Sequence, residues 1–271
     1  MKTIAILGCG WLGLSLGEYL VGQGYRVKGS TTRVEKLAQL MAVGIEAHHL
    51  TIGDTIVGTD TDDFFRCDVL VLNIPPGRRQ PDVETRYPQQ VRLVAEAARA
   101  AGCRHLLFVS STGVYPAERQ IQVRTFPTGP TTASGRALVE SENYLRGSSD
   151  WSTTVLRLAG LIGGQRQPGR WFAGRQDLPG ARVPVNLVHR EDCIQAIVAI
   201  VEQEKWGEEY HLCATEHPLK SDYYPEMARK LGLEPPSYAE GLEMPPYKVI
   251  DNSQILADLG LVLRFPDPRL I

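Results

Sequence analysis

Three glycines near the amino terminus have the spacing of a phosphate-binding turn. Gly8 ends a short run of β-branched and apolar residues, and Gly10 and Gly13 follow before an apolar helical pattern. Such glycines allow a tight turn, a close approach of backbone to a pyrophosphate, and packing of the helix on the strand. The phosphates would lie on the free N–H groups at the start of the helix. The spacing predicts a dinucleotide site made by Gly8, Gly10, Trp11, Leu12 and Gly13; the alternative is an ordinary glycine turn.

The residues about 20 positions after this turn bear on which dinucleotide is bound. An NAD site normally has Asp or Glu there for the ribose hydroxyls, whereas an NADP site has small polar groups and a cation. Ser30 occupies the expected acidic position, Thr31 supplies a hydroxyl, and Arg33 can make a bidentate contact to phosphate. This pattern favours NADP, with NAD possible. In the alternative reading, Thr32 only caps the next helix and Arg33 is solvated.

Strand-like and helical patterns alternate along most of the chain, which is typical of a parallel sheet covered on both faces. The predicted fold class is α/β, a Rossmann doubly wound parallel sheet of about seven strands with a small irregular C-terminal substrate lobe. The strand-like runs lie at 3–7, 25–29, 44–48, 68–74, 104–110, 153–158 and 209–213. The helical patterns lie at 11–22, 33–42, 88–101, 133–146 and 190–203.

Two segments break this alternation and predict a smaller lobe. The first is dense in Gly, Pro and Arg, and the second is rich in proline. We therefore expect a dinucleotide-binding Rossmann domain at 1–162, completed by 187–214, and a substrate-binding lobe made of 163–186 and 215–271. Open α/β sheets bind ligands at the carboxyl ends of their strands, where this lobe is expected.

Three arginines of the first irregular segment have the chemistry to bind an anionic substrate. Arg166, Arg170 and Arg175 lie within ten residues among glycines and prolines. Such a cluster suits a carboxylate or a phosphate. A solvated basic loop is the alternative interpretation.

The composition predicts small-molecule partners. The net charge of −2, from 29 basic and 31 acidic residues, gives no field for nucleic acid or an anionic membrane. The five cysteines are scattered without CxxC spacing, so we expect no disulfide framework, no metal site and a cytoplasmic location. No apolar stretch reaches transmembrane length, and the first strand begins too early for a signal peptide.

Several motifs follow the glycine turn in a characteristic order: VLVLNIPP, LLFVSSTGVY, VLRLAGLIG and VNLVHREDCIQAI. With them the whole chain resembles an extended short-chain dehydrogenase/reductase, most closely the atypical NAD-dependent epimerase/dehydratase-like proteins of the YeeZ-like group. The resemblance implies that Asn73, Ile74 and Pro75 line the cofactor and that Ser111 matches the catalytic Ser/Thr. Members of the family often dimerise, so a monomer or a homodimer is expected.

The chain departs from the Tyr-x-x-x-Lys pair of this family. Alignment of the following helix puts Thr132 at the tyrosine and Arg136 at the lysine. An aliphatic hydroxyl cannot be the general acid or base, although Arg136 can hold ribose hydroxyls. Tyr115, four residues after Ser111, is the natural substitute phenol, and a packing role is its alternative. We interpret His189 as structural.

Two functions remain open at this point. The first is an NADP(H)-binding oxidoreductase, or an epimerase or dehydratase, that transfers hydride on a small anionic or sugar-nucleotide-like substrate. The second is a catalytically silent NAD(P)-binding sensor or scaffold. Ser111 and the arginine-rich segment favour the enzyme, whereas Thr132 and Arg136 favour the sensor.

Overall fold

The computed structural model covers residues 1–271 and describes all of them except 78–80, 119, 123–127 and 240–244. The chain divides into two compact units, each described here by itself. The first unit comprises Met1–Val114, Thr128–Arg157 and Ile197–Tyr210. The second comprises the described residues of Tyr115–Pro127, Leu158–Ala196 and His211–Ile271.

An eight-stranded, mostly parallel sheet in the order β11-β8-β6-β5-β1-β2-β3-β4 forms the centre of the fold. The strands are β1 (Thr3–Leu7), β2 (Arg26–Thr31), β3 (Glu46–Ile52), β4 (Ile56–Gly58), β5 (Val69–Leu72), β6 (His105–Ser111), β8 (Ser152–Leu158) and β11 (Glu209–Leu212). This confirms the predicted α/β Rossmann class and its seven strands. The additional strand is β4, which pairs antiparallel with β3 at the sheet edge and has only three residues, too few for a periodicity signal.

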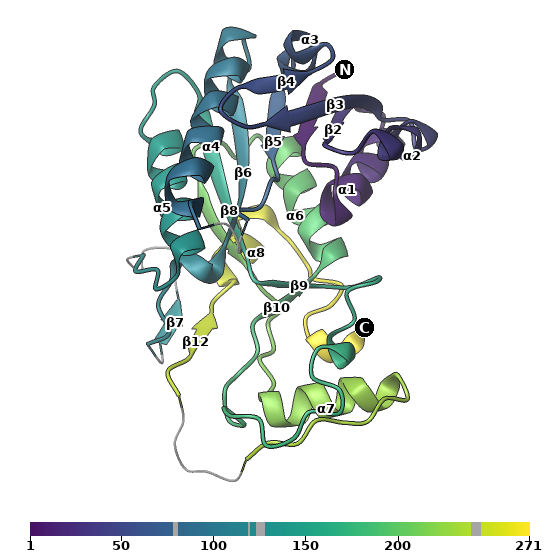
Figure 1. The fold of residues 1–271 in the computed structure, drawn as a ribbon, viewed down its shortest axis with the longest axis vertical. Coiled ribbons are helices and arrows are strands. Elements are labelled where there is room, and N and C mark those ends of the chain that lie inside the picture. Colours follow the sequence, from purple (N-terminus) through teal and green to yellow (C-terminus); the bar gives the residue numbers. More distant parts are fainter. Residues whose placement is uncertain (78–80, 119, 123–127, 240–244) are drawn as a thin grey trace. The chain divides into compact units, whose positions relative to one another are not determined.

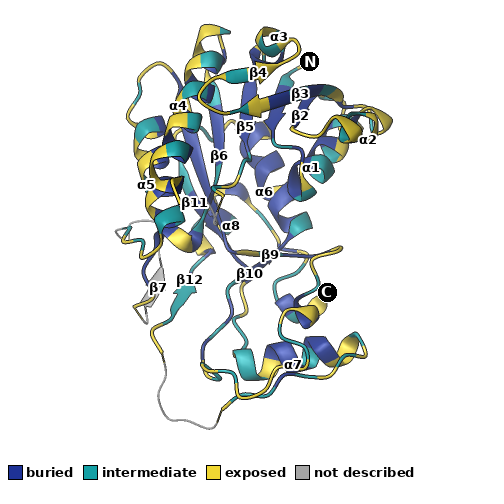
Figure 2. Cartoon of the chain, in the orientation of Figure 1, coloured by how far each residue is buried: buried dark blue, intermediate teal, exposed yellow. Residues whose placement is uncertain are grey.

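Helices cover both faces of this sheet (Figure 1). In the first unit, α4 and α5 pack side by side on one face, while α1 lies on the other. The helices of the described residues are α1 (Trp11–Gly22), α2 (Leu37–Ala42), α3 (Thr61–Phe65), α4 (Val83–Ala100), α5 (Ala133–Arg146), α6 (Arg190–Glu202), α7 (Lys220–Lys230) and α8 (Ser253–Leu259). Figure 2 shows the central strands as buried and the outer faces of α4 and α5 as exposed, so the apolar strands form the core.

One helix begins earlier than its sequence suggests. The helix predicted at 88–101 starts with Pro88, and the first turn is the position in which a helix tolerates proline best. In the structure α4 begins at Val83, and Pro88 lies inside the helix. The extra turn contains Glu84, which becomes important for the site below.

The second unit contains two small parallel pairs of strands. Strand β9 (Gly160–Ile162) pairs with β10 (Leu187–His189), and β7 (Gln120–Gln122) pairs with β12 (Lys248–Ile250). An apolar cluster of this unit joins β9 and β10 to α7 and includes Ile162, Val185, Leu187, Tyr223, Tyr224 and Met227.

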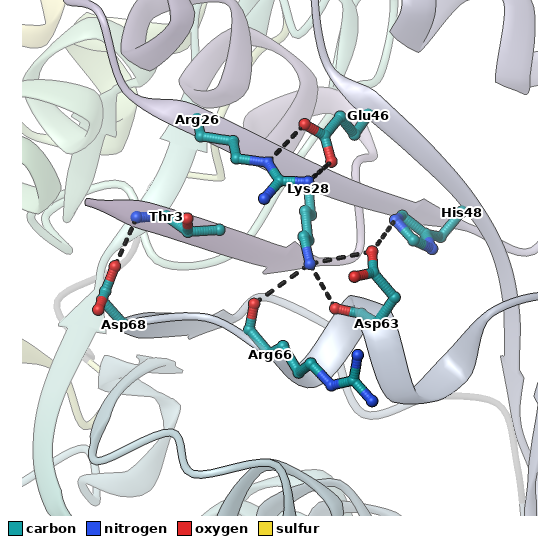
Figure 3. Close-up of polar contacts among 8 residues, drawn as sticks. All are labelled: Thr3, Arg26, Lys28, Glu46, His48, Asp63, Arg66 and Asp68. Atoms are coloured by element: carbon teal, nitrogen blue, oxygen red, sulfur yellow. Dashed lines mark hydrogen bonds and ion pairs between the residues drawn. The ribbon is translucent and has the colours of Figure 1, made fainter. Parts of the chain in front are cut away.

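A buried lysine ties strand β2 to helix α3 near the amino ends of the strands (Figure 3). The Lys28 side chain is 1 % exposed. Its ammonium donates to the carbonyls of Asp63 and Arg66 and lies 3.0 Å from the Asp63 carboxylate. A cation that binds the last carbonyls of a helix satisfies acceptors that the helix itself leaves unpaired. Because ligands of such sheets bind at the carboxyl ends of the strands, we assign this cluster to stability.

The environment of His48 in this cluster leads us to expect that the protein is less stable in mild acid. Burial lowers the pKa of His48, and this effect exceeds the opposing attraction of Asp63, whose carboxylate lies 4.0 Å from Nε2. Between the lowered pKa and the unfolded value of about 6.5, this residue is protonated mainly in the unfolded state. The free energy of unfolding therefore decreases as the pH is lowered through this range. Denaturant unfolding from about pH 7.5 to about pH 5.5 should show this fall, and His48→Gln should reduce it. An unchanged pH dependence in the variant would contradict the assignment.

Candidate cofactor and active site

The glycine turn joins β1 to α1, and its three glycines meet different constraints. Gly8 has φ of +101°, a left-handed conformation that favours glycine. A Cβ at Gly13 would lie 2.4 Å from the Gly8 carbonyl oxygen, so only glycine allows α1 to approach this closely. A Cβ at Gly10 would meet no atom of the described residues within 4 Å. The backbone before α1 is therefore open where a phosphate would approach the first turn.

Two side chains hold the turn in place. The Gly8 amide donates to Ser30 Oγ at 3.0 Å, and the Cys9 amide donates to the Ser30 carbonyl at 2.8 Å. Asn73 Nδ2 donates to the Gly8 carbonyl at 3.0 Å. Ser30, near the end of β2, is 3 % exposed, so in this structure its hydroxyl binds the turn and not solvent. These contacts fix the turn between β2 and the segment that follows β5.

The other two residues of the cofactor-choice pattern differ in exposure. Thr31 is buried and its hydroxyl accepts from the Arg33 amide at 3.2 Å. The Arg33 side chain is exposed. Arg33 is thus the member of the predicted set that has a side chain able to reach a ligand in solution.

The segment after β5 lies beside the turn. A Cβ at Gly8 would lie 3.1 Å from Ile74 Cγ2. The hydroxyl of Tyr87, a buried residue of α4, donates to the Ile74 carbonyl at 2.9 Å, and burial raises the pKa of this phenol. Pro75 follows as an exposed residue. Asn73 and Ile74 are therefore brought to the glycine turn, as their expected role requires.

The segments that carry Ser111 and Thr132 pack on one another through Gly113 and Gly135 at the carboxyl end of β6. Ser111 Oγ accepts from the Gly113 amide at 3.1 Å. Gly113 in turn packs on the start of α5, where a Cβ at Gly135 would lie 2.9 Å from the Gly113 carbonyl oxygen. Thr132 precedes α5, and its Oγ1 accepts from the Gly135 amide at 3.1 Å. Thr132 is therefore an N-cap, a role that needs a hydroxyl and not a phenol.

A buried ionic network supports the strand end that carries Ser111. Ser110 Oγ donates to Glu142 of α5 at 2.5 Å. Glu142 and Arg157 of β8 form an ion pair at 2.6 Å, with both side chains almost fully buried. Arg157 also pairs with Glu209 of β11 at 2.7 Å. Paired in this way, the buried charges join three strands to α5.

Arg136, at the aligned lysine position, makes a bidentate ion pair. Its Nε donates to Glu84 Oε2 at 2.9 Å, and its Nη2 donates to Glu84 Oε1 at 2.6 Å. This hydrogen bonding holds the pKa of the Glu84 carboxyl below its usual range. Glu84 lies in the first turn of α4, and Arg136 lies in the first turn of α5.

Tyr115 belongs to the second unit and is 2 % exposed. Its hydroxyl makes a hydrogen bond with Nε2 of His211, a residue to which the sequence assigned no role. The two rings are edge to face, with centroids 5.1 Å apart. Lys248 Nζ donates to the Tyr115 carbonyl at 2.6 Å. This phenol therefore has an imidazole as its neighbour in the second unit.

The three arginines of the irregular segment are exposed side chains of the second unit. Arg166 forms a backbone bridge with Gly163, Arg170 ends a short 3₁₀ helix, and the Arg175 guanidinium lies 5.8 Å from the centre of the Phe172 ring. All three lie in one segment and carry the same positive charge.

His189 has a packing environment. Its ring lies 3.7 Å from that of Phe265, and burial lowers its pKa. The neighbouring Asp192 accepts from the amides of Arg264 and Phe265 at 2.7 and 3.2 Å. Both residues anchor the C-terminal segment of the second unit.

Comparison with known proteins identifies the family. Residues 8–204 match the model of the NAD(P)H-binding family. The chain belongs to this family. The protein YeeZ of Escherichia coli K12 is 39 % identical over 273 residues, which span 100 % of this chain and 99 % of YeeZ. The resemblance to the YeeZ-like group is thus confirmed, and a nicotinamide dinucleotide is the cofactor type of the family.

Two solved structures share the fold of this family member. A short-chain dehydrogenase/reductase superfamily protein from Agrobacterium tumefaciens, with bound NAD, has a TM-score of 0.77 and 18 % identity over 95 % of this chain and 91 % of its own. UDP-glucuronic acid 4-epimerase from Bacillus cereus, in complex with UDP-glucuronic acid and NAD, has a TM-score of 0.80 and 16 % identity over 99 % and 96 %. At these identities the likeness shows the fold alone. No helix in the described part of the chain is long and apolar enough to cross a membrane.

The different constraints on the glycines predict different effects of substitution. Gly10→Val places a branched side chain in open space, so the protein should keep its stability and lose about tenfold or more in nucleotide affinity. Gly13→Ala should instead destabilise the fold by about 1–3 kcal/mol through its clash with Gly8. Fluorescence titration with NADPH and thermal unfolding measure the two effects. Equal affinities of the wild type and Gly10→Val would show that this turn does not hold the phosphates.

Proposed function

We propose that the protein is an NADP(H)-dependent oxidoreductase, or an epimerase or dehydratase acting through transient oxidation. The main support for this proposal is the glycine turn. Ser30 and Asn73 hold this turn, and the space beside Gly10 is empty. When bound, the nicotinamide donates or accepts a hydride. The residues of the turn fit the diphosphate of such a cofactor because they combine backbone N–H groups with a surface that has no side chain.

The preference for NADP rests on the end of β2. Ser30 stands where an NAD site normally has a carboxylate, and its hydroxyl is bound to the turn. Arg33 is an exposed cation three residues later. A guanidinium there can pair with a 2′-phosphate, whereas NAD offers it only a hydroxyl.

We assign roles to the remaining groups on the same basis. Ser111 binds the substrate oxygen, and Arg136 binds the nicotinamide ribose. Tyr115 exchanges the proton in this proposal, and its hydrogen bond with Nε2 of His211 gives the phenol a polar side-chain partner. Its burial also fits the packing role that is the alternative. Arg166, Arg170 and Arg175 bind the anionic part of a small or sugar-nucleotide-like substrate, in keeping with the UDP-sugar complex of the epimerase that shares the fold.

A second function, a nucleotide-binding sensor without turnover, is favoured by one specific observation. Thr132 caps α5, and Arg136 is paired with Glu84, so both positions of the usual catalytic pair have local partners. A sensor would keep the nucleotide site and show no hydride transfer with any carbonyl or sugar-nucleotide substrate.

The cofactor preference is tested by equilibrium binding. NADPH should bind at least several-fold more tightly than NADH, and Arg33→Ala should erase most of this difference by removing a charge-assisted contact worth about 1.5–3 kcal/mol. The partly exposed Arg86 of α4 provides a control, because Arg86→Ala removes an equal charge elsewhere. Equal affinities for the two nucleotides in the wild type would refute the preference.

Turnover with a panel of UDP-sugars and small carbonyl acids separates enzyme from sensor. Net oxidation or reduction is followed by NADPH absorbance, whereas epimerisation and dehydration, which return the cofactor to its starting state, are followed by chromatography of the products. Tyr115→Phe should lower kcat by about two orders of magnitude or more. Thr132→Ala should cost about 1 kcal/mol of stability through the lost cap while leaving kcat nearly intact. Hydride transfer that survives Tyr115→Phe would remove Tyr115 from the mechanism. NADPH binding without turnover on any member of the panel would support the sensor.

A further inference from the structure

Glu84 and Arg136 face one another from two adjacent helices of the first unit. Glu84 lies in the first turn of α4, and Arg136 lies in the first turn of α5. Their side chains are 46 % and 48 % exposed, so the pair contributes little to stability. A bidentate contact nevertheless fixes the plane of the guanidinium.

The contacts of Arg136 leave a defined set of donors. A guanidinium has five N–H donors. Glu84 takes the Nε donor and one donor of Nη2, and the Thr131 carbonyl accepts from Nη1 at 3.4 Å. Among the contacts made by described residues, one donor therefore remains on each terminal nitrogen. Two neighbouring donors in one plane match two adjacent oxygen acceptors, such as the hydroxyls of a ribose.

The replacement of lysine by arginine makes an orienting partner necessary. A lysine ammonium is a point charge with rotating donors, whereas an arginine must have the correct plane to donate twice. Glu84 supplies this plane, and it also cancels the positive charge of Arg136. A cation at this position lowers the pKa of a neighbouring phenol in the usual pair, but Thr132 has no phenol to tune. The neutral pair thus suits binding more than acid–base chemistry.

We infer that Glu84 is a positioning residue, which holds Arg136 so that its two remaining donors meet the nicotinamide ribose hydroxyls. This inference rests on the proposed function, because it requires a bound nicotinamide dinucleotide. It predicts that Glu84 affects binding only through Arg136.

The same two helices contain a matched control. Arg92 of α4 and Glu140 of α5 form an ion pair at 2.9 Å, with side-chain exposures of 49 % and 51 %. This pair has the opposite polarity and lies further along both helices. Loss of either pair should therefore have the same small effect on the packing of α4 and α5.

The test is a double-mutant cycle in NADPH affinity, measured by fluorescence titration of the full chain. Glu84→Ala should weaken binding about threefold to tenfold, and Arg136→Ala should weaken it at least as much. The double variant should bind like Arg136→Ala alone. Glu84→Gln, which keeps an oxygen acceptor, should recover part of the affinity, and Glu140→Ala should leave it unchanged.

Each contrary result has a distinct meaning. Tighter binding by Glu84→Ala would overturn the inference, because Glu84 would then compete for Arg136 or repel the phosphates. Additive losses in the double variant, or an equal loss in Glu140→Ala, would also overturn it, because Glu84 would then act on the fold or on another group. If the wild type binds neither NADPH nor NADH, the proposed function itself fails. If the wild type binds and only the cycle fails, the proposed function stands.

Discussion

The close approach of α1 to the strand before it is the constraint on which the candidate site depends. Position 13 accepts no side chain, because even a Cβ would reach to 2.4 Å from the Gly8 carbonyl oxygen. The same carbonyl accepts from Asn73, so the turn, α1 and the end of β5 are fixed as one body. Since β1 lies at the centre of the sheet between β5 and β2, this contact determines where the first N–H groups of α1 point. In the proposed function, these N–H groups form an anion site that needs no charged side chain.

A small neutral side chain also holds the turn at the end of β2. Ser30 ties the Gly8 amide from the side where many dinucleotide sites have a carboxylate for the ribose. Ser30 is 3 % exposed, so a carboxylate at this position would be buried. The small hydroxyl instead accepts from the turn. Under the proposed function, recognition of the second ribose is then left to exposed side chains such as Arg33, which would link stabilisation of the turn to the choice of cofactor.

The sequence was sufficient for the features that depend on local pattern. The seven main strands, the glycine turn and the family resemblance follow from runs of apolar residues and short motifs. Glu84 was missed because Pro88 suggested a later helix start, and a proline in the second turn of a helix is an exception to its usual position. His211 was missed because it meets Tyr115 across 96 residues of chain, and no periodicity reports such a contact. Strand β4 was missed because three residues carry no alternation.

Thr132 and Arg136, which stand at the two positions of the usual catalytic pair, each have a local structural partner. A cation at position 136 lies beside the start of α5, where the helix dipole disfavours positive charge. Arg136 avoids this cost because Glu84 neutralises it, and Thr132 replaces a phenol with the hydroxyl that caps the helix. The first turn of α5 thus contains a helix cap and an ion pair, and neither group can take the part of a phenol in proton transfer. Under the proposed function, the exchanged proton must therefore come from a group outside this turn, and the proposal assigns it to Tyr115, whose hydroxyl is bound to His211.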